Sequence, residues 1–204
     1  MTIRERGYVP HWESEGATYF VTFRLADSLP QSVLAQIASE RAAMVRTARQ
    51  LARDLSPDEL KKLHNLSTQR IEQYLDKGAG ACHLNNPTIA RVVAEALRHF
   101  DGTRYRNFAW CVMPNHVHAL FGVLPGFSLA SVMHSWKSFT AKEANRILKA
   151  HGDFWQREYY DHLIRNQAEF ERAVQYTAEN PVKAGLRNWP WVWVRGSEAA
   201  AARP

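Results

Sequence analysis

Cysteine, glycine and proline are scarce in this 204-residue chain, and each scarcity excludes a class of protein. The 2 cysteines, Cys82 and Cys111, are too few for a disulfide framework. They form no C-x-x-C pair or Cys/His knuckle, which excludes the usual structural zinc sites and favours a reducing cytoplasm. The 10 glycines and 9 prolines are too few for a fibrous or disordered chain.

Long apolar runs are also missing. The opening stretch MTIRERGYVP lacks the apolar core of a signal peptide. No later stretch approaches the roughly 18 uncharged apolar residues of a membrane-spanning helix. We therefore expect a cytoplasmic protein that is neither exported nor embedded in a membrane.

Acidic residues are outnumbered, with 26 Lys and Arg against 20 Asp and Glu, giving a formal net charge of +6. Such an excess favours polyanionic partners, because neutralising a polyanion releases its counterions. It is equally typical of a merely basic protein. Charge alone therefore does not identify the partner.

Hydrophobic periodicity predicts the order of secondary structure. In the stretch TYFVTFRL, Tyr19, Val21 and Phe23 alternate with Phe20 and Thr22, which predicts a strand. The predicted elements are, in order, a strand over 18–25, helices over 31–53 and 56–75, a helix from Asn86-Pro87 to Asp101-Gly102, strands over 105–113 and 116–123, a helix over 128–149, a strand over 159–164 and a helix over 167–180.

This order predicts an α+β fold. Without the two helices that follow the first strand, the series is β, α, β, β, α, β, α, which resembles a ferredoxin-like antiparallel sheet with helices on one face. The two remaining helices then form an insertion over about 31–85. We expect one domain over 1–195 and a flexible tail over 196–204.

His116 and His118 are the first candidate site residues. They lie two apart on a predicted strand, so both project from the same face. Two adjacent imidazoles are half of a metal site, although a His-x-His pair alone is also typical of ordinary histidines. The next position on that face is Leu120, so the third histidine of nucleotide-binding hydrolases is absent.

Tyr176 and Asn180 lie four residues apart on the last predicted helix and are neighbours on one side of it. If Phe170, Val174 and Ala178 face the core, Tyr176 and Asn180 lie on the flank and can face the adjacent strand. Tyr176 is equally compatible with an ordinary amphipathic edge. Asn180, before a proline, is equally compatible with the end of a helix.

Four ordered blocks now indicate a family. The blocks GATYFVTFRLADSLP, WCVMPNHVHALFGV, FWQREYYDHLIRN and ENPVKAGL resemble the single-tyrosine HUH (IS200-like) transposases, especially the REP-associated tyrosine transposases of bacteria. The resemblance spans about Gly16 to Leu186 except the insertion. The chain departs from the family after ENPVKAGL, where WPWVWVRGS replaces a Pro-Trp-Ser-Ser element. This departure leaves the mode of hairpin binding open.

The resemblance implies a role for each candidate residue. His116 and His118 match the metal-binding histidine pair, Tyr176 matches the nucleophile, and Asn180 matches the polar residue that completes the metal site. The family is an enzyme family of DNA transposition and recombination that cleaves and rejoins single-stranded DNA beside imperfect, REP-like hairpins. It uses a divalent metal and a 5′-phosphotyrosine intermediate. The resemblance thus implies a bacterial, nucleoid-associated endonuclease, acting as a monomer or a homodimer.

The residue types suit this chemistry. A phenol with a pKa of about 10 is a weak nucleophile at neutral pH, so either the phosphorus must become more electrophilic or the phenol more acidic. A bound cation does the first. We expect Mg²⁺ or Mn²⁺, and two nitrogen ligands favour Mn²⁺ at least as much as Mg²⁺.

Several alternatives stay open at this stage. Tyr159 and Tyr160 are the other candidate nucleophiles, and Asp161 and His162 are candidates for orienting a metal ligand. A domesticated, non-catalytic hairpin-binding protein is the main alternative function. A replication initiator or relaxase with the same histidine motif is a third.

Overall fold

A five-stranded antiparallel sheet forms the centre of the computed structural model. The structure describes residues 2–6, 9–13, 16–50, 71–72, 74–75 and 77–197. The strands lie in the order β6-β3-β5-β4-β7. Their bounds are Thr18–Arg24 for β3, Tyr105–Val112 for β4, His116–Val123 for β5, Tyr160–Leu163 for β6 and Val192–Val194 for β7.

The central strand β5 is buried at every position, because helices cover both faces of the sheet. It follows β4 through a tight turn in which the Met113 N–H donates to the His116 carbonyl at 2.8 Å. A connection this short permits only an antiparallel pair, as the sequence predicted. The turn also fixes where the first histidine enters the sheet.

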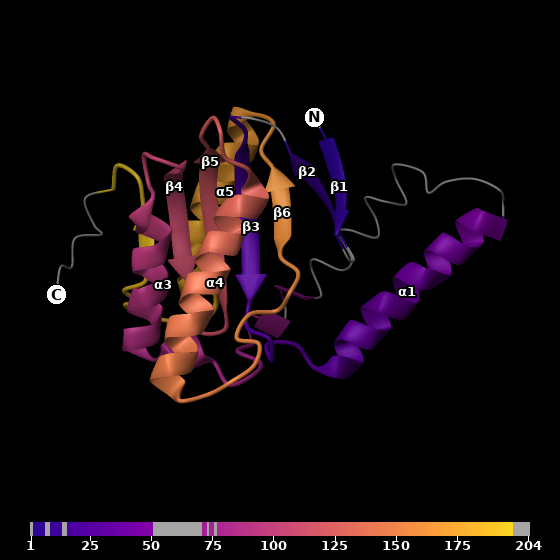
Figure 1. Cartoon of the computed structure of the whole chain (residues 1–204), viewed down its shortest axis with the longest axis horizontal. Coiled ribbons are helices and arrows are strands. Elements are labelled where there is room, and N and C mark those ends of the chain that lie inside the picture. The colour runs from indigo at the N-terminus through magenta and orange to yellow at the C-terminus, as the bar shows by residue number, and fades with distance from the viewer. Residues whose placement is uncertain are drawn as a thin grey trace.

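Two helices cover one face of the sheet and a third covers the other (Figure 1). The main core packs α3 and α4 against Tyr19, Val21 and Phe23 of β3. A smaller cluster packs α5 against Phe20 and Leu120 on the opposite face. The bounds are Pro87–His99 for α3, Leu129–Leu148 for α4 and Gln167–Lys183 for α5.

Local signals explain where these helices begin. The Asn86 side chain accepts a hydrogen bond from the Thr88 N–H and precedes a proline at the first helical position. Ser128 and Ser131 form a reciprocal capping box at the start of α4. Both starts agree with the sequence prediction to within one residue.

The α+β fold class is confirmed. Strands β3, β4, β5 and β6 lie in the order β6-β3-β5-β4, which is the ferredoxin-like arrangement. The predicted last helix, α5, covers the second face, which corrects the expectation that the helices lie on one face. The structure adds the edge strand β7 and an antiparallel pair of β1 (Thr2–Arg6) and β2 (Val9–Glu13). These additions enlarge the predicted fold without changing its order.

The first helix of the predicted insertion is α1 (Gln31–Gln50), which extends away from the sheet in Figure 1. The second predicted helix, 56–75, lies largely outside the described residues, as does most of the tail over 196–204. The described end of the insertion runs from Leu75 through a glycine loop. It leads into the short helix η1 (His83–Asn85) just before α3.

The glycine loop closes against the segment that follows β3. Gly80 has φ +89°, and a Cβ there would come within 2.7 Å of the Asp27 carbonyl oxygen. The Ala81 N–H donates to the Asp27 carboxylate at 2.7 Å. Only glycine therefore fits this contact without displacing backbone.

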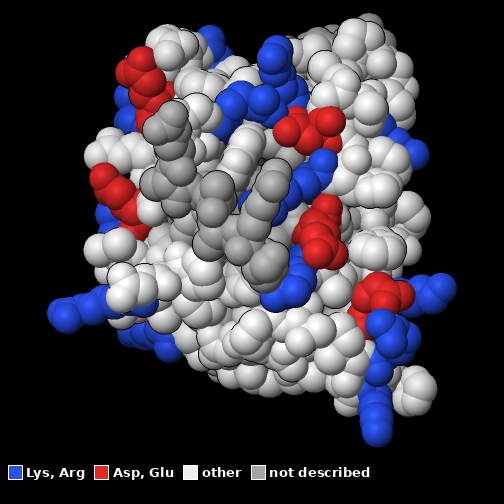
Figure 2. Space-filling view, turned by 90° about the vertical axis from the view of Figure 1, so that its left-hand side faces the viewer, with Lys and Arg blue, Asp and Glu red and all other residues white. Residues whose placement is uncertain are grey.

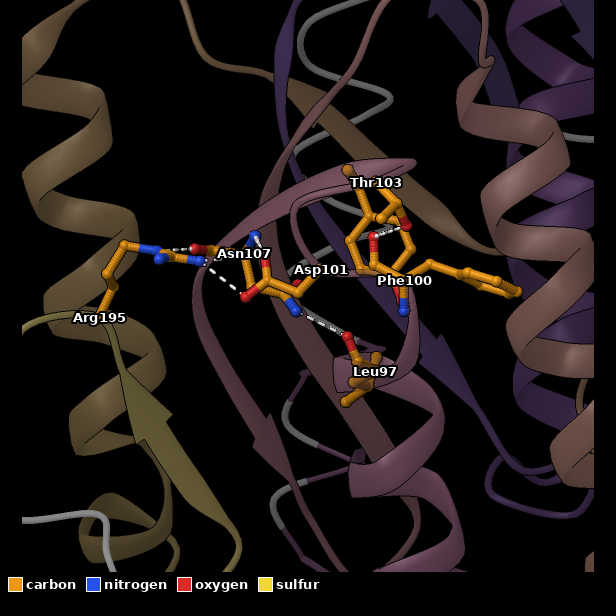
Figure 3. Close-up of polar contacts among 7 residues, drawn as sticks. Leu97, Phe100, Asp101, Thr103, Asn107 and Arg195 are labelled. Carbon is orange, nitrogen blue, oxygen red and sulfur yellow. Dashed lines mark hydrogen bonds and ion pairs between the residues drawn. The ribbon is translucent and has the colours of Figure 1, made fainter.

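A polar network attaches the C-terminal strand β7 to the turn between α3 and β4 (Figure 3). Arg195 binds both carboxylate oxygens of Asp101 at 3.0 and 2.7 Å and donates to the Asn107 carbonyl at 2.6 Å. Asp101 also accepts from the Asn107 N–H, and the Asn107 side chain donates to the Leu97 carbonyl. These contacts connect the end of the chain to the core.

Surface charge is mixed on the face shown in Figure 2, where Lys and Arg side chains alternate with Asp and Glu. The basic excess therefore does not form a single continuous stripe on the visible part of this face. In the described residues, no helix is both long enough and apolar enough to cross a membrane.

A candidate metal and nucleophile site

The register of β3 and β5 places the two histidines on the face that α5 covers. Thr22 lies directly opposite His118, and Arg24 lies opposite His116. Opposed residues of an antiparallel pair share a face. The neighbouring pair, Phe20 and Leu120, packs under α5, so the histidines face the same helix.

The imidazoles converge on one point. Their Nε2 atoms are 2.9 Å apart, and the ring planes are inclined at 79°. His116 is 1% exposed and His118 is fully buried. The sequence prediction that both histidines project from one face is confirmed.

Each outer ring nitrogen has an oxygen partner. His116 Nδ1 is 2.7 Å from Asn115 Oδ1, and His118 Nδ1 is 2.8 Å from Thr22 Oγ1. Asn115 Oδ1 can only accept, so we assign the proton of His116 to Nδ1, which leaves a lone pair on Nε2. The Thr22 hydroxyl can donate or accept, so it suits either tautomer of His118.

Both histidines are neutral at physiological pH. Burial, followed by the proximity of His118, holds the pKa of His116 well below its usual value. Burial lowers the pKa of His118 to about 3. Neutral imidazoles with lone pairs are the form that binds metal ions.

Tyr176 on α5 lies against this pair. Its ring centroid is 5.2 Å from that of His118 and 5.7 Å from that of Phe20, both in edge-to-face geometry. The Lys183 ammonium lies 5.6 Å from the centre of the same ring and pairs with Glu179 at 3.0 Å. The structure thus brings Tyr176 and the histidines together, as the sequence predicted.

Asn180 lies one turn beyond Tyr176 and is 2% exposed. Its Oδ1 has no hydrogen-bond partner among the described residues. The helix continues through Pro181 to Lys183, so Asn180 does not end it. A buried amide oxygen without a partner carries a desolvation cost that a cation can offset.

The donor set fits a divalent cation. Two neutral imidazoles and an amide oxygen suit Mn²⁺ and are compatible with Mg²⁺ that keeps several waters. Within the part of the chain that the structure describes, no three His, Cys, Asp or Glu side chains are grouped to hold a metal. Any third protein ligand there would therefore be of another residue type, and the candidate is Asn180, one helical turn from Tyr176.

A half-buried cation, Arg24, accompanies the histidines. Burial lowers the pKa of the Arg24 guanidinium to about 10, and Glu158 opposes this shift. Arg24 therefore stays charged at neutral pH, beside neutral histidines. Sequence reasoning missed it, together with Thr22, Asn115 and Lys183, because these contacts depend on strand register and on the packing of α5.

The other candidates have different partners, although Tyr160 and His162 share the face that α5 covers, opposite Thr22 and Phe20. His162 approaches Glu169 at 3.3 Å, and Asp161 lies opposite Val21, which belongs to the α3 and α4 side of the sheet. Neither is placed to orient His116 or His118, whose partners are Asn115 and Thr22. Burial raises the pKa of Tyr160 to about 12, which makes it a poorer nucleophile.

A ferredoxin-like sheet that presents a His-x-His pair to a tyrosine on a covering helix agrees with the resemblance to single-tyrosine HUH transposases that the sequence motifs indicated. Residues 86–180 match the family model described as "Transposase IS200 like". This segment, which contains both histidines, Tyr176 and Asn180, is similar to that family.

Two curated relatives carry matching names. The chain is 30% identical over 88 residues to "REP-associated tyrosine transposase" of Escherichia coli K12, covering 41% of this chain and 50% of that protein. It is 28% identical over 102 residues to "Putative REP-associated tyrosine transposase" of Haemophilus influenzae, covering 43% of this chain and 57% of that protein. The alignments span about half the length of these relatives.

A solved structure is also similar. It is described as a REP-associated tyrosine transposase bound to a REP hairpin. The match covers 94% of this chain and 82% of that chain, with 18% sequence identity and a TM-score of 0.49.

Proposed function

We propose that this protein cleaves and rejoins single-stranded DNA beside hairpins, with Tyr176 as the nucleophile and a divalent metal at His116, His118 and Asn180. The observation that carries the proposal is the contact of the Tyr176 ring with His118, at the point where the two Nε2 atoms converge. A nucleophile and paired metal ligands in one place suit phosphoryl transfer.

The proposed step is a balanced transesterification. The Tyr176 phenolic oxygen attacks the phosphorus, the bond from phosphorus to the 3′ oxygen breaks, and the phenolic proton is lost as the departing 3′ oxygen gains one. The products are a free 3′-hydroxyl and a 5′-phosphotyrosine ester. Because one ester replaces another, attack by a different 3′-hydroxyl rejoins the strand without an external energy source.

The protein residues supply position and charge. His116 and His118 would hold Mg²⁺ or Mn²⁺, and when bound this ion polarises a non-bridging phosphate oxygen. Packing against Phe20 and His118 restricts the Tyr176 ring to few orientations, which favours in-line attack. Arg24 and Lys183 add positive charge close to the phosphodiester.

The proposed partner is unpaired DNA next to an imperfect, REP-like hairpin. Support comes from the relatives' names and from the basic excess of the chain. Attack by a side chain that is packed between its own helix and the sheet requires a flexible strand, which favours unpaired over duplex DNA. Cytoplasmic action in a bacterium, associated with the nucleoid, is part of this proposal.

A denaturing gel tests the reaction. End-labelled hairpin DNA with single-stranded flanks, taken from repeats beside the gene, is incubated with protein in Mg²⁺ or Mn²⁺. We expect a metal-dependent adduct that survives denaturant and is absent with Tyr176→Phe, because the phenylalanine ring keeps the packing but has no attacking oxygen. Chelator is expected to abolish the adduct.

The matched control is Tyr160→Phe, which removes a hydroxyl from the same face of the sheet. It is expected to keep the adduct. An adduct that persists in Tyr176→Phe would contradict the assignment of the nucleophile. Hairpin binding with no adduct or cut product in any metal would instead favour the non-catalytic binding protein.

A further inference from the structure

Asn115, in the turn between β4 and β5, contacts two separate parts of the molecule. Its Nδ2 donates to the carbonyls of Leu75 and Ala79 at 3.2 and 2.9 Å. Its Oδ1 is 2.7 Å from His116 Nδ1. The side chain is fully buried, so these contacts alone determine its orientation.

Leu75 and Ala79 belong to the described end of the helical insertion. The same end is fixed by the contact of Ala81 with Asp27 and by the Leu84 N–H, which donates to the Pro114 carbonyl at 3.1 Å. Pro114 precedes Asn115 in the turn. The end of the insertion therefore rests on the turn that leads into His116.

We propose that Asn115 is a positioning residue that connects the insertion to the metal site, so that displacing the insertion weakens metal binding at His116. The inference rests on the proposed role of His116 as a metal ligand. The new point is that the insertion, which does not itself supply a ligand, influences metal binding at His116.

The chemistry of the amide explains the link. While Ala79 and Leu75 accept from Nδ2, Oδ1 must face His116, which keeps the proton of His116 on Nδ1 and the lone pair on Nε2. If these carbonyls move away, the amide is free to rotate and present its N–H groups to Nδ1. His116 Nδ1 then accepts a hydrogen bond from the amide, so the His116 proton moves to Nε2. Nε2 thereby loses the lone pair that would bind the metal.

The first test measures Mn²⁺ affinity on the full chain by electron paramagnetic resonance of free Mn²⁺. Asn115→Ala is expected to bind Mn²⁺ about 10- to 100-fold more weakly, as is typical when the hydrogen-bond partner of a ligating histidine is removed. Nitrogen-15 NMR of the metal-free protein should show a loss of the single Nδ1–H tautomer of His116. The matched control is Asn107→Ala, a fully buried asparagine at the other end of the sheet, which should leave the affinity unchanged.

The second test moves the insertion without changing the site. Gly80→Ala forces a Cβ against the Asp27 backbone, whereas Gly126→Ala, at φ +83°, has no atom within 4 Å. Gly80→Ala is expected to weaken Mn²⁺ binding and Gly126→Ala is not. Combined with Asn115→Ala, the Gly80→Ala change should have no further effect, because the link is already broken.

The outcomes separate the two proposals. A wild-type chain that binds no Mn²⁺ contradicts the proposed metal site itself. If the wild type binds Mn²⁺ and Asn115→Ala binds it equally well, the positioning role is wrong. If Asn115→Ala does not fold, the comparison of Gly80→Ala with Gly126→Ala is the deciding test. Equal Mn²⁺ affinity in these two variants overturns the proposed connection between the insertion and the metal site.

Discussion

At the scale of single residues, the two histidines are held by partners of different chemistry. Asn115 Oδ1 is an acceptor only, whereas the Thr22 hydroxyl can donate or accept. The Nε2 atoms are 2.9 Å apart, so both can bind one cation when each ring carries its proton on Nδ1. Metal binding by both rings therefore requires the Nδ1–H tautomer of His118, in which the Thr22 hydroxyl is the acceptor.

Thr22 is the residue whose change tests this assignment. Thr22→Val keeps the shape of the side chain but gives His118 Nδ1 no partner in either tautomer. We expect Mn²⁺ affinity to fall about 10- to 100-fold, measured by titration calorimetry. Thr22→Ser keeps the hydroxyl and should bind Mn²⁺ like the wild type. Equal affinities for the valine and serine variants would show that Thr22 does not orient His118.

Residue patterns predicted part of this site. The two-residue spacing on a strand placed His116 and His118 on one face, and the family resemblance selected Tyr176 and Asn180. Thr22 and Asn115 could not be found in this way, because their roles depend on which residue the register of β3 and β5 places beside each ring. Lys183 likewise depends on how α5 lies across the sheet.

At the scale of elements, the short strand β7 depends on side-chain contacts beyond its few backbone pairs. It pairs with β4 at three positions only. Arg195 attaches its end to the α3–β4 turn through Asp101 and Asn107 (Figure 3). This attachment predicts a local loss of order when the guanidinium is removed.

Arg195→Met is the corresponding test. We expect unfolding free energy to fall by about 1 kcal/mol, because the ion pair is partly exposed but is joined by a hydrogen bond to a carbonyl. Faster hydrogen exchange should be confined to β7 and the part of β4 near Asn107. The control is Arg146→Met, whose ion pair with Glu143 lies on an exposed helix surface and should contribute less. Equal losses in both variants would contradict the attachment of β7 by Arg195.

The elements that the sequence predicted correctly are those with strong periodicity or clear capping residues. Asn86-Pro87 and Ser128 marked two helix starts, and TYFVTFRL marked β3. β7 was missed because three residues after a proline are too few to show alternation. The face taken by α5 was also not predicted, since it follows from the packing of Phe170 and Tyr176 on Phe20 and Leu120.

At the scale of the whole molecule, one chain contains the complete candidate site. Tyr176 contacts His118 of its own chain, and Asn180 is on the same helix. A single copy therefore holds both the proposed nucleophile and the proposed metal ligands. The proposed chemistry at one phosphodiester does not require residues from a second copy.

Mixing two inactive variants tests this arrangement. Tyr176→Phe lacks the nucleophile and His118→Ala lacks a ligand, so a mixture restores adduct only if a site forms between chains. We expect no adduct in the mixture at any ratio, measured on a denaturing gel beside wild type. Restored adduct would show that Tyr176 of one copy works with the histidines of another.

The most direct measurement is tandem mass spectrometry of the protein after reaction with hairpin DNA, nuclease treatment and trypsin digestion. The account predicts that the peptide between Arg172 and Lys183 carries a nucleotide 5′-phosphate on Tyr176, in metal-containing but not chelated samples. A nucleotide on Tyr159 or Tyr160 would contradict the assigned nucleophile. Cleaved DNA without a nucleotide on any tyrosine would contradict covalent strand transfer altogether.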